Sequence, residues 1–346
     1  MLRRPMRTAL IVTCALIATC AGYTTYWQST ADEIRGGIHR WAEERRAKGW
    51  TVELGVPSVR GFPLRLELFI QTPILAGPRN QWRWEMPNVS ASARPWALTN
   101  IKMSVPGIHK LKTEGQAMVF TLARANGGLQ IRSGKPQIFA VRLAGLEWVK
   151  KNGVTTSIDT LSLQVEDAVS FNAQSDNPTK GIIVSLDAAK MFLPEAWNLP
   201  LGNGLSRLSF DAVITGLLEP RGTLPEALSR WSNAGGAIEL RSFGLNWEAL
   251  SLRGEGTIAL DANLQPQGAI TAEIDGVEKL TDALIAAGVI NARAAFAAKI
   301  VNNILSFDRG SARQPISIQR QRLYLGPVPL FRLKPVRWKQ LYLSNR

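Results

Sequence analysis

Twenty consecutive residues near the N-terminus, Thr8 to Trp27, carry no charge. About twenty apolar residues at helical rise are needed to span the ~30 Å hydrocarbon core of a bilayer, so residues 8–27 predict a transmembrane helix. Arg3, Arg4 and Arg7 precede this run. Because cytoplasmic flanks carry an excess of basic residues, we expect residues 1–7 in the cytoplasm and the chain after Trp27 on the opposite side of the membrane.

The end of the run bears on whether this segment is an anchor or a cleaved signal peptide. Tyr23, Tyr26 and Trp27 have amphipathic rings of the kind that collect at the membrane–water interface. A signal peptide needs a small-x-small cleavage site after a shorter apolar core, and no clean Ala-x-Ala lies near the end of the run. We therefore expect an uncleaved single-pass anchor and a mature protein that keeps residues 1–27.

The charge of the chain is concentrated at its two ends. Forty-one lysines and arginines against 27 aspartates and glutamates give a net charge of +14. The three N-terminal arginines and nine basic residues between Arg309 and Arg346, a stretch without acidic residues, account for all but two of these charges. A nucleic-acid-binding domain usually carries its basic residues on the folded body. The distribution therefore favours a membrane as partner, with no nucleic acid expected.

The basic C-terminal tail, residues 331–346, alternates cationic with apolar side chains. Such a mixture suits the surface of an anionic bilayer, since each basic residue there contributes about 1 kcal/mol. The alternative is a solvated terminal segment. The candidate membrane-surface residues are Arg332, Lys334, Arg337, Trp338 and Lys339.

The residues that usually carry catalysis are scarce. The chain has two cysteines, both inside the apolar run, and two histidines, which leaves little room for a zinc site, a thiol enzyme or a disulfide scaffold. His109 has no Ser, Cys or Asp motif placed to make it a catalytic base. Gly254–Ala259 mimics a dinucleotide fingerprint, but it runs into an alternating strand where the motif requires a helix. We expect no enzymatic activity, no cofactor and no metal.

The hydrophobic period predicts a mainly β (α+β) protein. Residues 28–48 carry one apolar helical stripe and predict an amphipathic helix. From 49 to 330 short alternating runs separated by Gly, Pro and Asn predict a large antiparallel, curved β-sheet body, with an internal boundary near 195–222. A capping box predicts a helix from Leu224 to Trp231, and residues 277–305 predict two helices separated at Gly288. Residues 323–330 predict the last strand.

An apolar face of this sheet is the candidate binding groove. Leu64 to Leu68 alternate apolar and charged residues, as a half-solvated strand does, and Trp82 and Trp84 fall on one face of any strand. The groove would be lined by leucines and tryptophans from two parts of the chain, although the same side chains could instead form a dry core. These residues are Leu64, Leu66, Leu68, Trp82, Trp84, Leu250 and Leu252.

Several short stretches, taken together and in their order along the chain, resemble an uncharacterised bacterial envelope family known as domain of unknown function 2125. They follow the basic, apolar N-terminus and extend over nearly the whole chain: Gly49-Trp50, Val59–Arg65, Trp82–Pro87, Gly222–Pro225 with Trp231, and Leu325–Leu330. The resemblance implies an inner-membrane-anchored periplasmic protein and supplies no catalytic residues. A more distant architectural likeness is to AsmA-like envelope proteins, which are associated with lipid handling.

Two hypotheses of function remain open. In the first, the membrane-tethered sheet binds or handles lipid on its apolar face, with the helical block as a lid or plug. In the second, the chain is a structural or assembly factor that binds another envelope protein through a sheet edge or a helix. Alternation of apolar and polar residues fits both, because an apolar sheet face can also be covered by helices.

Overall fold

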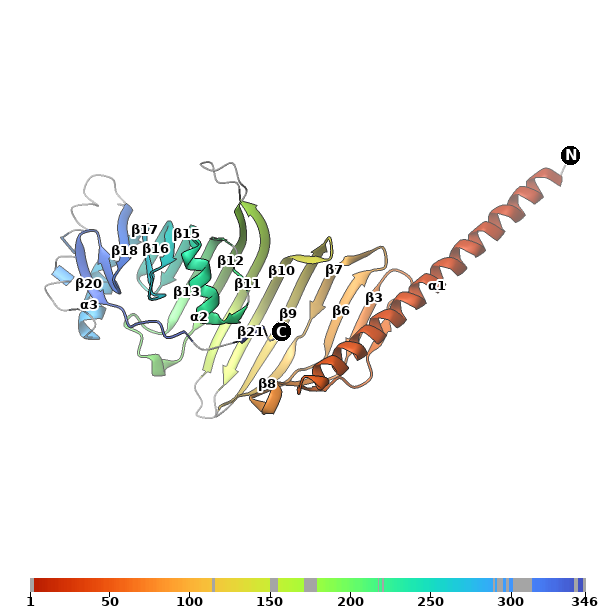
Figure 1. Cartoon of the computed structure of the whole chain (residues 1–346), viewed down its shortest axis with the longest axis horizontal. Coiled ribbons are helices and arrows are strands. Elements are labelled where there is room, and N and C mark those ends of the chain that lie inside the picture. The colour runs from red at the N-terminus through yellow and green to blue at the C-terminus, as the bar shows by residue number, and fades with distance from the viewer. Residues whose placement is uncertain are drawn as a thin grey trace. The chain divides into compact units, whose positions relative to one another are not determined.

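A single long helix opens the chain. The computed structural model describes residues 3–113, 116–149, 155–170, 179–216, 218–219, 221–288, 290, 295–296, 299–300, 313–338 and 342–344. Helix α1 runs without interruption over Arg3–Ala47, so the predicted membrane segment and the predicted amphipathic helix form one element. The stretch beginning at Thr8 is long and apolar enough to cross a membrane. Figure 1 shows its N-terminal half projecting beyond the strands of the first unit.

Most of the described residues after α1 form antiparallel β-strands, which confirms the predicted fold class. It divides into two compact units, residues 1–135 and 136–346. The range 195–222, considered from the sequence as a boundary, lies inside the second unit.

The sheet of the first unit is built as two branches that start from one strand. The first half of the long strand β9, Gln116–Leu122, pairs with β8, which continues through β5 and β4 to β1. The second half of β9, residues 126–130, pairs with β7, which continues through β6 and β3 to β2. The elements are β1 (Thr51–Glu53), β2 (Ser58–Arg60), β3 (Leu66–Ile70), β4 (Ile74–Ala76), η1 (Pro78–Asn80), β5 (Trp82–Glu85), β6 (Val89–Arg94), β7 (Ala97–Ser104), β8 (Gly107–Thr113) and β9 (Gln116–Arg132).

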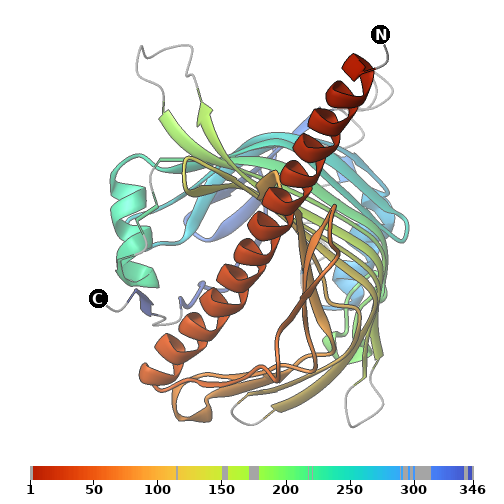
Figure 2. The same ribbon diagram turned by 90° about the vertical axis from the view of Figure 1, so that its right-hand side faces the viewer.

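The second unit is an antiparallel meander in which nearly every strand pairs with the next one along the chain, and its sheet is curved (Figure 2). Helix α2 (Leu224–Asn233) follows the short β14, and α3 (Val277–Ala286) follows β17. The remaining elements are β10 (Lys135–Val149), β11 (Thr155–Ser170), β12 (Thr179–Phe192), η2 (Glu195–Trp197), β13 (Gly204–Thr215), β14 (Gly222–Thr223), β15 (Ala237–Trp247), β16 (Leu250–Leu260), β17 (Pro266–Asp275), β18 (Arg313–Gln319), β19 (Arg322–Leu325), β20 (Val328–Arg332) and β21 (Tyr342–Ser344).

Several local predictions can be compared with these elements. The helix predicted from Leu224 is α2, and the Glu226 carboxylate accepts the Thr223 backbone N–H at 2.9 Å, as a capping box requires. Gly288 has a φ of +67° two residues after α3 ends, and much of the second predicted helix, up to residue 305, lies outside the described residues. The prediction of one strand over 323–330 is wrong, because a turn at Gly326 separates β19 from β20.

Candidate apolar binding face

The strands of the first unit place apolar side chains opposite one another on one side of the sheet, called here the first apolar face. In one branch the register aligns Val52, Leu75, Trp84, Leu111 and Met118 across five strands. Directly paired residues of adjacent strands point to the same side of a sheet, so these five form one row. The row starts buried at Val52, and its other members are half-buried.

The C-terminal half of α1 covers part of the first apolar face. Trp27 and Ala31 pack with Val59 and Leu66 in one buried cluster. Further along the helix, Ala42 packs in a second cluster with Val52 of β1, Leu54 just after it, and Ile70 of β3. Burying these groups against a helix stripe stabilises this unit. The strands at the end of each branch, β1 in one and β2 with β3 in the other, therefore form a dry core with α1. The apolar side chains further along the first branch, on β4, β5, β8 and β9, stay partly exposed.

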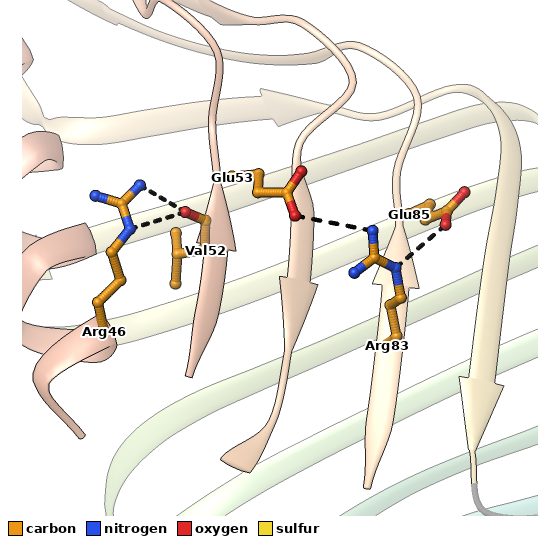
Figure 3. Close-up of polar contacts among 5 residues, drawn as sticks. All are labelled: Arg46, Val52, Glu53, Arg83 and Glu85. Carbon is orange, nitrogen blue, oxygen red and sulfur yellow. Dashed lines mark hydrogen bonds and ion pairs between the residues drawn. The ribbon is translucent and has the colours of Figure 1, made fainter. Parts of the chain in front are cut away.

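Figure 3 shows how the end of α1 and the polar side of the same sheet are held. The Arg46 guanidinium donates to the Val52 carbonyl, with Nε at 3.0 Å, which fixes the last turn of α1 against β1. On the polar side, Arg83 lies between Glu53 at 3.8 Å and Glu85 at 3.3 Å. These pairs are partly exposed, so we expect each to contribute less than about 1 kcal/mol. Because these charged side chains point to the opposite side of the sheet, they do not lie on the first apolar face.

His109 is a buried polar group on the first apolar face. It is 2% exposed, its ring stacks on Phe120 at 4.8 Å, and Trp84 lies 5.9 Å from it between ring centroids. Its Nε2 lies 3.0 Å from the Val105 carbonyl, which can only accept, so Nε2 carries the proton in this contact. Burial lowers the pKa of His109 below 6.5, and the bond to Val105 partly opposes this shift. Among the described residues, His109 Nδ1 and Trp84 Nε1 are buried without a hydrogen-bond partner.

The second unit has an apolar row of its own, called here the second apolar face. The register aligns seven side chains across seven strands, from β10 to β17. Ala188 is buried and the other six are half-buried, so the row retains contact with solvent. Its members are Leu143, Leu161, Ala188, Leu208, Leu245, Leu252 and Ile274.

Two glycines on this face allow the backbones of β16 and β17 to approach closely. A Cβ at Gly256 would lie 2.2 Å from the Ala269 carbonyl oxygen, and one at Gly268 would lie 2.1 Å from that of Thr257. Both distances are far below van der Waals contact, so only glycine fits the sheet at these two positions.

Helix α2 and the C-terminal segment both pack at one end of the strands of the second unit. Trp231 is 3% exposed and its indole N–H donates to the Thr215 carbonyl at 2.7 Å, where β13 ends. The Ser232 hydroxyl donates to the Leu260 carbonyl at 2.9 Å, where β16 ends. Residues 333–338 continue along this end, and β21 pairs with β14.

The predicted groove residues of the first unit separate into three environments. Leu64 lies in the turn before β3 and is 67% exposed, so the alternating strand begins at Leu66 and the expectation that Leu64 belongs to it is wrong. Leu66 is 2% exposed beneath α1, in the dry core. Leu68, Trp82 and Trp84 are half-buried. Leu68 packs on both helix clusters, and Trp82 packs edge-on against the Trp50 ring at 5.4 Å.

In the second unit, the predicted pair of leucines on β16 lies at different depths. Leu250 is 6% exposed, and its backbone lies beside Gly276, where α3 begins. Leu252 is half-buried in the middle of the second apolar face, opposite Leu245 and Ile274. Leu252 is therefore the residue of this pair that a ligand on the face would contact.

The predicted membrane-surface residues lie on a segment that packs against the second unit. Arg332, Lys334 and Arg337 are exposed. Trp338 is half-buried, and its indole N–H donates to the Leu264 carbonyl at 2.8 Å. Lys339 lies outside the described residues.

Sequence reasoning missed the stacked His109 and the cross-strand partners of Trp84. Leu111 lies between Lys110 and Lys112, and His109 shares its parity, a local signal that places His109 inward if the segment is a strand, although Ile108 breaks the alternation. Among the described residues no group of three His, Cys, Asp or Glu side chains lies close enough to hold a metal ion. The expectations of no cofactor and no enzymatic activity stay predictions.

These features define a class: an antiparallel β-sheet protein whose first helix is long and apolar enough to serve as a membrane anchor or a signal sequence. Residues 27–334 match the family model described as an uncharacterized protein conserved in bacteria, DUF2125, and the chain belongs to that family. No curated protein and no solved structure matches the chain. The architectural likeness to AsmA-like proteins therefore stays a prediction.

Proposed function

We propose that this protein is a non-enzymatic lipid-binding protein, anchored by α1 in the inner membrane, with its sheets in the periplasm. One observation carries the proposal. Each unit presents cross-strand apolar rows whose members beyond the dry core are only half-buried. Apolar side chains left in contact with water favour an acyl chain as occupant, because removing their surface from water stabilises the complex by roughly 25 cal/mol per Å².

The polar sides of the sheets support the same proposal. In the second unit Arg207 pairs with Asp187 at 2.7 Å, and Arg313 lies 3.5 Å from both Glu255 and Glu273. Charged side chains on one side and apolar ones on the other make a sheet that separates water from a ligand-binding surface. A lipid with an acyl chain is the ligand class that matches a continuous apolar row.

The test is native extraction of the full chain in mild detergent, followed by lipid mass spectrometry. Leu252→Glu places a charge in the middle of the second apolar face, at a half-buried position where the carboxylate still contacts water in the ligand-free protein. Gln267→Glu, on the polar side of β17, is the matched control. We expect stoichiometric lipid with the unaltered chain and the control, and its loss with Leu252→Glu.

Three results would contradict the proposal. Lipid content unchanged by a folded Leu252→Glu variant excludes this face as the binding site. If Leu252→Glu unfolds the protein, the row is a dry core. A defined protein partner that co-purifies without lipid would favour the assembly-factor hypothesis.

A further inference from the structure

Three large apolar side chains of the first unit are exposed in two turns that lie against α1. Phe62 and Leu64 belong to the turn between β2 and β3, and they are 51% and 67% exposed. Trp96 belongs to the turn between β6 and β7 and is 60% exposed. Leaving these side chains in water is unfavourable, so their clustering near one segment of α1 indicates a surface for an apolar partner.

Hydrogen bonds from α1 fix the position of both turns along the helix. The Tyr23 hydroxyl donates to the Pro63 carbonyl, and the Tyr26 hydroxyl donates to the Pro95 carbonyl at 2.7 Å. One turn of helix separates these two tyrosines, so the β2–β3 and β6–β7 turns lie at nearly the same height on α1.

Trp27 also joins α1 to the β2–β3 turn, on the buried side of the helix. Its indole N–H donates to the Arg65 carbonyl at 3.0 Å, and the Phe62 ring packs edge-on against it, with centroids 5.6 Å apart. Trp27 itself is 7% exposed. The Trp27 ring that the sequence predicted for the membrane–water interface is therefore covered by protein side chains. Phe62, Leu64 and Trp96 are the exposed groups at that height.

The length of the apolar run places this height at the membrane surface. Residues 8–22 precede the first contact of α1 with the sheet at Tyr23, and at 1.5 Å per residue they span only about 22 Å. The hydrocarbon core is ~30 Å thick, so crossing it requires about five further residues. Those residues are 23–27, the ones that hold the two turns.

The charges around the turns complement an anionic surface. Arg60, Arg65 and Arg94 flank the turns and are exposed, and neither turn, residues 61–65 or 94–97, contains an acidic residue. The Arg94 guanidinium lies over the Trp96 ring at 6.0 Å. Aromatic rings with neighbouring arginines are the combination that settles at the headgroup level.

We propose that Phe62, Leu64 and Trp96 insert into the interface of the same membrane that α1 crosses, so that the two turns seat the first unit directly on the bilayer surface. The proposal deepens the proposed function, since it rests on α1 as an anchor, but it does not depend on lipid binding by the apolar faces. The partner is a bilayer with anionic headgroups, contacted by a fixed surface rather than approached through a flexible tether.

The test labels single cysteines in the full chain with an environment-sensitive fluorophore in anionic vesicles. Cys14 and Cys20 are both exposed on α1 and are first replaced by alanine. Labels are then placed by Leu64→Cys and Trp96→Cys, with Val56→Cys as the matched control. Val56 is an equally apolar loop residue, 88% exposed, between β1 and β2. Nitroxides on the lipid headgroup and iodide in the buffer report membrane and water contact.

We expect headgroup nitroxides to quench the labels at positions 64 and 96 and iodide to leave them unquenched, with the reverse at position 56. Equal iodide quenching at all three positions, with the chain still retained in the vesicles after alkaline washing, overturns this proposal and leaves the anchor intact. A chain that alkaline washing releases overturns the anchor and this proposal together. Lipid mass spectrometry of the same preparations reports separately on the apolar faces.

Discussion

At the scale of single residues, two leucines close in sequence have opposite roles. Leu66 is 2% exposed between Trp27 and Val59, and Leu64 is 67% exposed in the preceding turn. We predict that Leu66→Ala lowers the free energy of unfolding by about 2–5 kcal/mol, since it leaves a cavity beneath α1. Leu64→Ala is the matched control and should change it by less than about 0.5 kcal/mol. Urea unfolding of the full chain in detergent measures both, and equal effects would contradict the assignment of Leu66 to the core.

His109 gives the first unit a pH-dependent contribution to stability. Burial lowers its pKa in the folded state below 6.5, so the unfolded chain takes up the proton first as the pH falls. The folded state is therefore destabilised below about pH 6.5, and the loss grows until the pH reaches the folded-state pKa.

We predict that His109→Phe, which preserves the stack on Phe120, reduces the drop in unfolding free energy between about pH 7 and about pH 5. Denaturant titrations at a series of pH values measure the slope. His39→Gln, at an exposed position on α1, is the control and should keep the slope of the unaltered chain. A His109→Phe slope identical to that of the control would mean that His109 is not buried as a neutral ring.

At the scale of elements, a buried glutamine side chain makes one of the contacts that hold the C-terminal segment to the second unit. Gln265 is 7% exposed in the turn between β16 and β17. Its Oε1 accepts the Val336 N–H at 2.7 Å, and its Nε2 donates to the Val336 carbonyl at 3.2 Å. The amide thus pairs with the backbone of Val336 much as a neighbouring strand would.

Gln265→Ala should release this segment while the strands stay paired. Loss of each hydrogen bond weakens a local structure by about 0.5–1.5 kcal/mol, and the variant removes both bonds to Val336, so we predict hydrogen exchange at least about fivefold faster in residues 333–338. Gln319→Ala, at an exposed position in β18, should leave that exchange unchanged. Fast exchange already in the unaltered chain would show that the segment is not fixed by Gln265.

The elements also show where sequence patterns stop being informative. The period of two and the capping box at Thr223–Glu226 are local signals, and they predicted the β body and α2. The strand β9 changes the parity of its buried side chains between Leu122 and Ala125, where the pairing partner changes from β8 to β7, and alternation alone does not reveal such a switch. The contact between Gln265 and Val336 joins residues 71 apart, which no local period encodes.

For the candidate site, the sequence predicted which side chains share the apolar side of the sheet but not how deeply each one is buried. That one side of the sheet is apolar follows from alternation, and Leu252 and Trp84 do lie in apolar rows. Which apolar residues are covered by a helix depends on tertiary packing, so the sequence could not separate the buried Leu66 from the exposed Leu64. The exposed position of Leu64 follows from the turn at residues 61–65, closed by the Arg65 N–H to the Gly61 carbonyl at 2.9 Å.

At the scale of the whole molecule, the predicted membrane segment and the core helix are one continuous element. Residues 9–22 of α1 contact no strand through the hydrogen bonds or apolar clusters of the described residues, whereas Trp27 and Ala31 lie in the core of the first unit. Removing the first 22 residues should therefore release the protein from the membrane and leave it folded. Removing the first 30 deletes Trp27 and should cost about 3–5 kcal/mol, the range for losing a large buried aromatic side chain.

Alkaline extraction of membranes and urea unfolding of the three chain lengths measure these two effects separately. We predict that only the full chain stays in the alkaline pellet, and that the chain lacking 22 residues unfolds with nearly the free energy of the full one. N-terminal sequencing of the mature protein provides the independent check. A mature start beyond residue 20 would mean that the apolar run is a signal peptide and that α1 serves only as the core helix. A chain lacking 30 residues that is as stable as the full one would exclude Trp27 from the core, and would remove the support for the proposal that the turns of the first unit lie at the bilayer.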